Sequence, residues 1–247
     1  MSSLLISIVR TIAHSMGIEI SKYPCPDLDP FALTIIKKVQ PYTMTSAERI
    51  YSACESVRYI IKNDIPGDIV ECGVWKGGSM MAMAMTLLEQ KNKSRDLWLY
   101  DTFEGMSEPT DKDVSVYGIE AKKIMTRKKR QGSVWCYSRL DEVKQAVYGT
   151  GYPKEKIKFI KGKVEDTIPK QIPNKISILR LDTDWYESTY HELVNLFPLL
   201  STGGVLIIDD YGYWQGSRQA TDEYIRDNQI KILLNRIDDS GRIAIKQ

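Results

Sequence analysis

The chain has 247 residues, of which 43% are hydrophobic and 27% are charged, and its formal net charge is +2. This balance is typical of one globular domain with a buried core, and so small a net charge disfavours nucleic acid as a partner. The four cysteines form no CxxC pair and have no companion histidine cluster, which excludes a recognisable zinc motif and favours reduced thiols in a cytoplasmic protein.

The first part of the chain, residues 1–45, is predicted to be a helical arm. Residues 4–16 place their apolar side chains on one helical face, but polar residues interrupt the run and it is too short to cross a bilayer. We therefore expect no membrane span, and a helix that packs on this chain or on a second copy in a homo-oligomer. A helix lying on a membrane surface is the alternative. Residues 17–44 are rich in proline and predict one short helix, at 31–39.

Strands and helices then alternate regularly through one domain, residues 46–247. The predicted strands are residues 68–72, 97–100, 157–160, 176–181 and 205–208, and the predicted helices are residues 46–62, 79–90, 141–148, 187–199 and 217–227. Residues 230–237 and 242–246 predict a closing hairpin around a glycine-containing turn. This order predicts a doubly wound α/β fold whose seven-stranded sheet is mostly parallel, with an antiparallel hairpin at its C-terminal end.

One connection is much longer than the others. Residues 104–132 are polar and rich in lysine, and they exceed the usual length of a connection in a compact domain. Such a segment is a functional lid or a disordered loop, and we predict a lid. The basic cluster at residues 122–130 is either a solvated surface or a binding site for an acidic acceptor.

Ligands of doubly wound sheets bind beyond the carboxyl ends of the strands, so the residues that follow each strand are the candidates for a site. A glycine-rich turn, residues 73–79, follows the first strand and leads into a helix whose N–H groups can bind an anion. Its spacing differs from G-x-G-x-x-G, which disfavours a nicotinamide oxidoreductase. The alternative interpretation is a tight turn that binds nothing.

The second and third strands end in residues that suit a nucleoside. Asp101, followed by Thr102 and Phe103, stands where an acidic residue accepts hydrogen bonds from the two ribose hydroxyls. After the third strand, Val164 and Glu165 offer an apolar side chain and a hydrogen-bond acceptor to an adenine ring. These strand ends therefore predict a cofactor site.

Four carboxylates follow the next two strands. Asp182 and Asp184 end one of them, and Asp209 and Asp210 end the other. Acids gathered at one edge of a sheet repel one another unless a cation joins them, and oxygen ligands favour Mg²⁺ first, then Mn²⁺ or Ca²⁺. The alternative is a set of solvated acids or helix caps.

Several long motifs together resemble the TylF/macrocin O-methyltransferase family. They are PYTMT at 41–45, DIVECGVW at 68–75, DTFEGM at 101–106, LDTDWYEST at 181–189 and DDYG at 209–212. The resemblance extends from about residue 41 to residue 218. Members of this family methylate sugar hydroxyls of macrolides and aminocoumarins with S-adenosylmethionine and Mg²⁺, so the resemblance implies the class I, Rossmann-like methyltransferase fold.

The resemblance also implies roles for particular residues. It implies that Asp182, Asp209 and Asp210 bind the metal and that Asp184 is the general base. The residues implied to contact the cofactor are Thr43, Met44, Glu71, Gly73, Ser79, Asp101, Val164 and Glu165, and we add the neighbouring Thr102 and Phe103 and the ligand Asp182.

The predicted function is therefore methyl transfer from S-adenosylmethionine to a hydroxyl of a small molecule, expected to be a sugar or a glycosylated natural product of an antibiotic pathway. Vicinal hydroxyls on this acceptor would contact the metal. Two alternatives remain open: the same chemistry on a catechol-type phenol, and a subunit that binds the cofactor without turnover. His191, inside a predicted helix, is expected to be structural.

Overall fold

The structure is a computed structural model that describes residues 27–127 and 135–247. The chain divides into two compact units, residues 1–34 and residues 35–247, and helix α2 (Pro30–Val39) contains residues of both. The helix expected at residues 4–16 lies outside the described residues. Among the described residues, no helix combines the length and the hydropathy that a membrane span requires. All elements after α2 belong to the second unit.

Seven strands of the second unit form one sheet. They are β1 (Asp68–Cys72), β2 (Leu97–Asp101), β3 (Ile157–Lys161), β4 (Ile176–Leu181), β5 (Leu200–Ile208), β6 (Asn235–Arg236) and β7 (Arg242–Ile245). Their order is β3-β2-β1-β4-β5-β7-β6; the first five are parallel, and β7 is antiparallel to both of its neighbours. The predicted fold class is therefore confirmed. Strands β2 and β3 are added on one side of β1, and β4 and β5 on the other. The strand order therefore changes direction between β1 and β4, and ligands of such sheets bind at this point.

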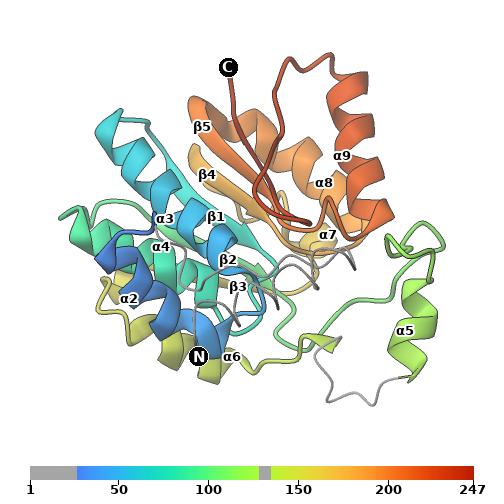
Figure 1. The fold of residues 1–247 in the computed structure, drawn as a ribbon, viewed down its shortest axis with the longest axis horizontal. Coiled ribbons are helices and arrows are strands. Elements are labelled where there is room, and N and C mark those ends of the chain that lie inside the picture. The colour runs from blue at the N-terminus through green and yellow to red at the C-terminus, as the bar shows by residue number, and fades with distance from the viewer. Residues whose placement is uncertain (1–26, 128–134) are drawn as a thin grey trace, which may run out of the picture. The chain divides into compact units, whose positions relative to one another are not determined.

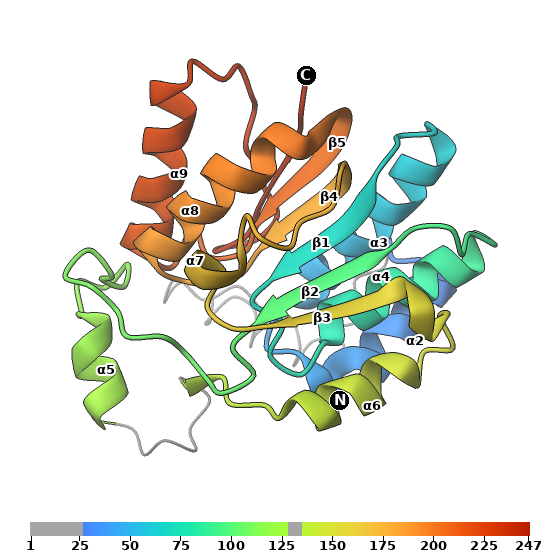
Figure 2. The same ribbon diagram turned by 180° about the vertical axis from the view of Figure 1, so that it is seen from behind.

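Helices cover both faces of the sheet. The helices after α2 are α3 (Ala47–Lys62), α4 (Gly78–Glu89), α5 (Ala121–Arg127), α6 (Leu140–Tyr148), α7 (Val164–Thr167), α8 (Tyr186–Leu196) and α9 (Gln215–Asp227), with short 3-10 helices at Gln40–Tyr42, Lys154–Lys156 and Phe197–Leu199. Figures 1 and 2 show α3, α4 and α6 on one face and α7, α8 and α9 on the other. Because both faces are covered, all six residues of β4 are buried.

Helix α3 begins where the sequence predicts it. The Ser46 side chain accepts a hydrogen bond from the backbone N–H of Arg49, which satisfies one of the N–H groups left open at a helix start. Ile50, Ala53 and Val57 lie on the buried face of the helix. Capping therefore fixes the first turn of α3 and, with it, the place of the Arg49 side chain.

The predicted strand at residues 230–237 is wrong over most of its length. Only Asn235 and Arg236 pair with β7; residues 230–234 form no strand. Ile230, Ile232 and Leu234 are instead partly buried against the main core. The alternation of apolar and polar residues in this segment therefore corresponds to burial of every second side chain, and the backbone does not pair as a strand.

The segment predicted to be a lid is attached to the domain by a buried acid. Asp113 is fully buried, and its carboxylate accepts hydrogen bonds from the N–H and hydroxyl of Thr110 and from the N–H of Tyr186, the first residue of α8. A small apolar cluster of Ala121, Met125, Trp185 and Trp214 joins α5 to the starts of α8 and α9. Residues 128–132 of the segment lie outside the described part.

Candidate active site

One cavity of about 520 Å³ lies at the carboxyl ends of the parallel strands. Its wall contains these predicted site residues: Thr43, Met44, Gly73, Ser79, Asp101, Thr102, Val164, Glu165, Asp182, Asp184, Asp209 and Asp210. Glu71 and Phe103 do not line it. The structure thus gathers the predicted donor-binding residues and the acids around one space.

The glycine-rich turn brings β1 and β4 into close contact. Gly73 has a φ of +80°, and a Cβ at this position would lie 1.9 Å from the carbonyl oxygen of Asp182. A Cβ on Gly78 would lie 2.6 Å from the carbonyl oxygen of Tyr42. Both positions therefore require glycine, and the backbone they form leaves room for a ligand at the start of α4.

Asp101 holds this turn in place. Its Oδ2 accepts hydrogen bonds from the N–H groups of Val74 and Trp75 at 2.7 and 2.9 Å, and its Oδ1 accepts one from Phe103 at 2.6 Å. Burial raises the pKa of Asp101, while these N–H donors favour its ionised form. The carboxylate therefore organises the ends of β1 and β2 before any ligand is bound.

Trp75, Phe103 and Asp184 follow strand ends near the cavity and have left-handed backbones although none is glycine. Trp75, Phe103 and Asp184 have φ values of +46°, +51° and +67°, and each follows a different strand of the sheet. Such conformations cost roughly 1–3 kcal/mol each and persist only where the surroundings impose them. Three of the strand ends at the site therefore carry a strained residue.

The acid cluster contains Asp182, Asp184 and Asp210. One carboxylate oxygen of each lies within 4.8 Å of the others. The Oδ2 of Asp210 is buried and has no hydrogen-bond partner among the described residues. Burial, together with the neighbouring carboxylates, raises the pKa of Asp184 to about 7 and that of Asp210 well above its usual range. Oxygen ligands this close, one of them unpaired, fit a hard divalent cation.

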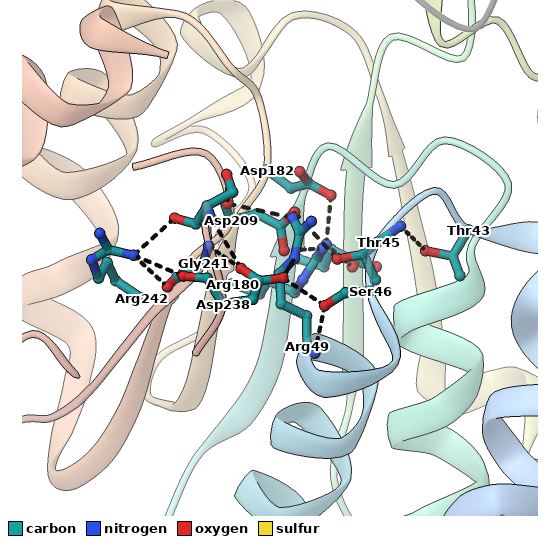
Figure 3. Close-up of polar contacts among 12 residues, drawn as sticks. Thr43, Thr45, Ser46, Arg49, Arg180, Asp182, Asp209, Asp238, Gly241 and Arg242 are labelled. Atoms are coloured by element: carbon teal, nitrogen blue, oxygen red, sulfur yellow. Dashed lines mark hydrogen bonds and ion pairs between the residues drawn. The ribbon is translucent and has the colours of Figure 1, made fainter. Parts of the chain in front are cut away.

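Asp209, the other predicted ligand, is paired with arginines. Its Oδ1 accepts a hydrogen bond from Nη2 of Arg180 at 2.5 Å, and its Oδ2 forms an ion pair with Arg49. Nη1 of Arg180 also contacts Glu71 and Asp182, both at 2.7 Å. Figure 3 shows the polar contacts that join Asp209, Arg180 and Arg49. Both oxygens of Asp209 are thus engaged within the protein.

Arg49 and Arg180 are functional-site residues that the sequence analysis missed. Arg49 also donates to Asp238 in the closing hairpin at 2.8 Å, where the Ser46 hydroxyl bonds the same oxygen (Figure 3). The signal for Arg180 was present, since it interrupts the otherwise apolar strand β4. A charged residue in a strand buried on both faces requires partners, and here they are three acids.

Aromatic side chains also line the cavity, next to the acids in the chain. The rings of Trp185 and Trp214 lie 5.0 Å apart at an interplanar angle of 74°, and Tyr213 contacts Trp214 at 5.1 Å in an edge arrangement. The indole N–H of Trp185 donates to the carbonyl oxygen of Ser107 in the lid segment at 3.0 Å. Acids and aromatic rings therefore face the same space.

Two other groups lie outside the cavity wall. The Nε2 of His191 lies 3.0 Å from the carbonyl oxygen of Ile168, which agrees with the structural role expected for it. In the basic cluster, Lys122 and Lys123 are exposed and lie near Asp111 and Glu120.

The strand order and the residues at the strand ends together define a class I methyltransferase with a Rossmann-like fold. A profile of the macrocin O-methyltransferase (TylF) family matches residues 36–244. The chain belongs to this family, and it is an O-methyltransferase.

Individual relatives agree with this assignment. The chain is 34% identical to demethyldecarbamoylnovobiocin O-methyltransferase of Streptomyces niveus, over 81% of this chain and 74% of the relative. It is 32% identical to a rhamnosyl-tetracenomycin C 4'-O-methyltransferase of Streptomyces olivaceus, over 87% and 80%. The structure of the O-methyltransferase NovP superposes with a TM-score of 0.73 at 32% identity, covering 83% of this chain and 82% of that one.

Proposed function

We propose that the protein transfers a methyl group from S-adenosylmethionine to a sugar hydroxyl of a glycosylated natural product, with the help of a divalent cation. The observation that carries this proposal is the shared cavity, whose wall contains both the acid cluster and the glycine-rich turn. The relatives named for novobiocin, tetracenomycin and mycinamicin derivatives support the acceptor class.

The donor would bind at the ends of β1, β2 and β3. The N–H groups at the start of α4 suit its carboxylate, and the strand end at Asp101 suits its ribose. Asp101 already accepts bonds from the turn, so it contributes to donor binding both directly and by holding the backbone of Val74 and Trp75. Val164 and Glu165 would flank the adenine.

Asp182 and Asp210 would hold the cation, because they belong both to the set implied by the family resemblance and to the cluster in the structure. When bound, this ion would lower the pKa of an acceptor hydroxyl and orient it. Asp184 would accept the hydroxyl proton, since its raised pKa of about 7 makes it a stronger base than an ordinary carboxylate. Asp209 as a ligand stays a prediction, because its oxygens are paired with Arg49 and Arg180.

The acceptor would lie between the acids and the aromatic wall. The lid segment contributes Met106 and Ser107 to the cavity wall, and Trp185 and Trp214 also belong to it. These side chains would exclude water and bind the apolar part of a glycoside, while the acids contact its hydroxyls.

The test is a methylation assay with S-adenosylmethionine and Mg²⁺. Acceptors would include a glycosylated aminocoumarin, a rhamnosylated polyketide, the matching aglycones and a catechol, and mass spectrometry would identify products one methyl group heavier. We expect methylation of glycosides only. Turnover of the catechol or of an aglycone without any glycoside product would contradict the proposed acceptor class.

A further inference from the structure

The turn between β4 and α8 carries two acids of the site on a strained backbone. Asp184 adopts a left-handed conformation with a φ of +67°, which a non-glycine residue keeps only when surrounding contacts impose it. The N–H of Asp182 donates to the carbonyl oxygen of Cys72 at 2.8 Å, and the N–H of Trp185 donates to that of Thr183 at 2.8 Å. These bonds fix the ends of the turn and leave its centre to be held by a side chain.

Thr183 lies at the centre of the turn, and a side chain of α8 contacts it. Its hydroxyl donates to Oε2 of Glu192, a residue of α8, at 3.2 Å. Glu192 is 0% exposed and does not line the cavity. Its Oε1 has no hydrogen-bond partner in the part of the chain that the structure describes. Glu192 therefore contacts the turn but not the space in which the reactants would bind.

Stability alone does not explain a glutamate at this place. Burial raises the pKa of Glu192 well above its usual range, and a buried carboxyl with one unpaired oxygen is costly. An apolar side chain of similar volume would fit this position between α8 and the sheet at less cost. The helix itself is firmly packed, since Leu193 and Leu196 belong to the main core. Glu192 is thus a polar group on a rigid support, directed at the site turn.

We infer that Glu192 is a positioning residue: its carboxyl holds Thr183 and thereby fixes the turn that presents Asp182 and Asp184 to the cavity. The inference rests on the proposed function of these two acids. The hydrogen bond between Thr183 and Glu192 restricts the turn to one conformation, so that the two acids are positioned before the reactants bind.

Two variants each remove one partner of the hydrogen bond between Thr183 and Glu192, and two other variants serve as controls. Glu192→Leu and Thr183→Val delete the hydrogen bond with little change of volume, whereas Glu192→Gln keeps an acceptor in the same place. Thr221→Val is the matched control, because this buried threonine of α9 bonds only the backbone of its own helix in the structure, at Ser217. Each protein is measured by thermal unfolding, by hydrogen exchange of residues 182–186, and by Mn²⁺ titration with S-adenosylhomocysteine present.

We expect Glu192→Leu and Thr183→Val to raise the exchange rate of the turn about five- to tenfold, as loss of a typical hydrogen bond implies, and to weaken Mn²⁺ binding by a similar factor. Glu192→Leu should melt no lower than the wild type, Glu192→Gln should behave like the wild type, and the double variant should be no worse than either single one. A solely structural role would instead lower the melting temperature and leave the turn unchanged.

Unchanged exchange in both deletion variants would overturn the inference. If Glu192→Leu does not fold, Thr183→Val, which alters a half-buried side chain, decides alone. Failure of the wild type to bind Mn²⁺ would refute the proposed cation site and leave the exchange measurement as the test of positioning.

Discussion

Asp182 and Asp184 lie two positions apart, yet their surroundings give them different chemistry. Oδ2 of Asp182 is 2.7 Å from Nη1 of Arg180, so this acid is held by a fixed positive charge. Asp184 lies beside the carboxylates of Asp182 and Asp210, and no ion pair with an arginine is present for it among the described residues. Arg180 contacts only one oxygen of Asp182, so the other oxygen can bind a cation, whereas Asp184, whose pKa is raised to about 7, suits proton transfer.

Substitution by asparagine should separate these roles. Asp184→Asn should lower kcat by about 10²–10⁴-fold, the typical contribution of a general base, and leave the Mg²⁺ concentration for half-maximal activity unchanged. Asp182→Asn should raise that concentration. The measurement is methyl transfer against Mg²⁺ concentration for both variants. If added Mg²⁺ restores Asp184→Asn, Asp184 is a third ligand, as the acid cluster also permits.

The raised pKa of Asp184 gives the reaction a defined pH dependence. Asp184 accepts a proton only when it is ionised, and burial raises its pKa to about 7. A cation bound by the neighbouring acids favours the ionised form, so we expect kcat/KM to rise with pH below about 7 and to be level above it. In Asp184→Asn this rise should be absent and the remaining rate should increase further in alkali, where hydroxide replaces the base. A wild-type profile that shows no acid limb below about pH 7, or an acid limb that persists in Asp184→Asn, would contradict the assignment.

At the scale of elements, the lid segment and α8 depend on one carboxylate. Asp113 accepts the N–H of Tyr186 at 2.7 Å and so caps α8 from a segment that lies seventy-three positions away in the chain. A Cβ on Gly216 would lie 2.3 Å from the same carboxylate, which shows how closely the start of α9 approaches it. Asp113 therefore joins the lid to the two helices that support the acid and aromatic walls.

Asp113→Ala should lower the free energy of unfolding by about 1–2 kcal/mol, the upper part of the range for a lost helix cap. Hydrogen exchange of residues 104–127 should become faster, and donor and acceptor together should slow it less than in the wild type. Asp111→Ala is the matched control, because its side chain is fully exposed and lies 3.9 Å from Lys122. Equal exchange in the two variants would show that the lid is held by other contacts.

Local signals were sufficient for most elements. The bounds predicted for β1 and β4 agree with the structure, because short apolar runs between turn residues are typical of buried parallel strands. The four-residue α7 and the helix α5 were not predicted, since neither has a periodic pattern long enough to detect.

At the scale of the whole molecule, the sequence motifs predicted residues that line the cavity, but they did not predict which acids pair with which arginines. The residues predicted to form the site lie at strand ends, where topology alone brings them together. Which acid pairs with which arginine depends on distances between α3, β4 and the closing hairpin, as the contacts of Arg49 with Asp209 and Asp238 show. Local patterns in a single sequence do not determine these distances between elements.

Buried acids also make the stability of the whole domain depend on pH and on cations. Burial raises the pKa of Glu71 to about 7, that of Asp184 to the same value, and that of Asp182 well above its usual range. The folded protein therefore keeps protons that the unfolded chain releases at the ordinary pKa of a carboxyl group. Their contribution to stability is present in acid and is lost as the pH rises through about 7.

For the cation-free protein we accordingly expect the melting temperature to fall between about pH 5 and about pH 8. A cation that binds only the folded state adds stability by mass action, and it competes with protons for the same carboxylates. Mg²⁺ should therefore raise the melting temperature more at about pH 8 than at about pH 5, and Asp182→Asn should abolish most of this difference. Thermal unfolding with EDTA and with Mg²⁺ at both pH values measures it. An equal Mg²⁺ effect at the two pH values, retained in Asp182→Asn, would place the stabilising ion outside the acid cluster.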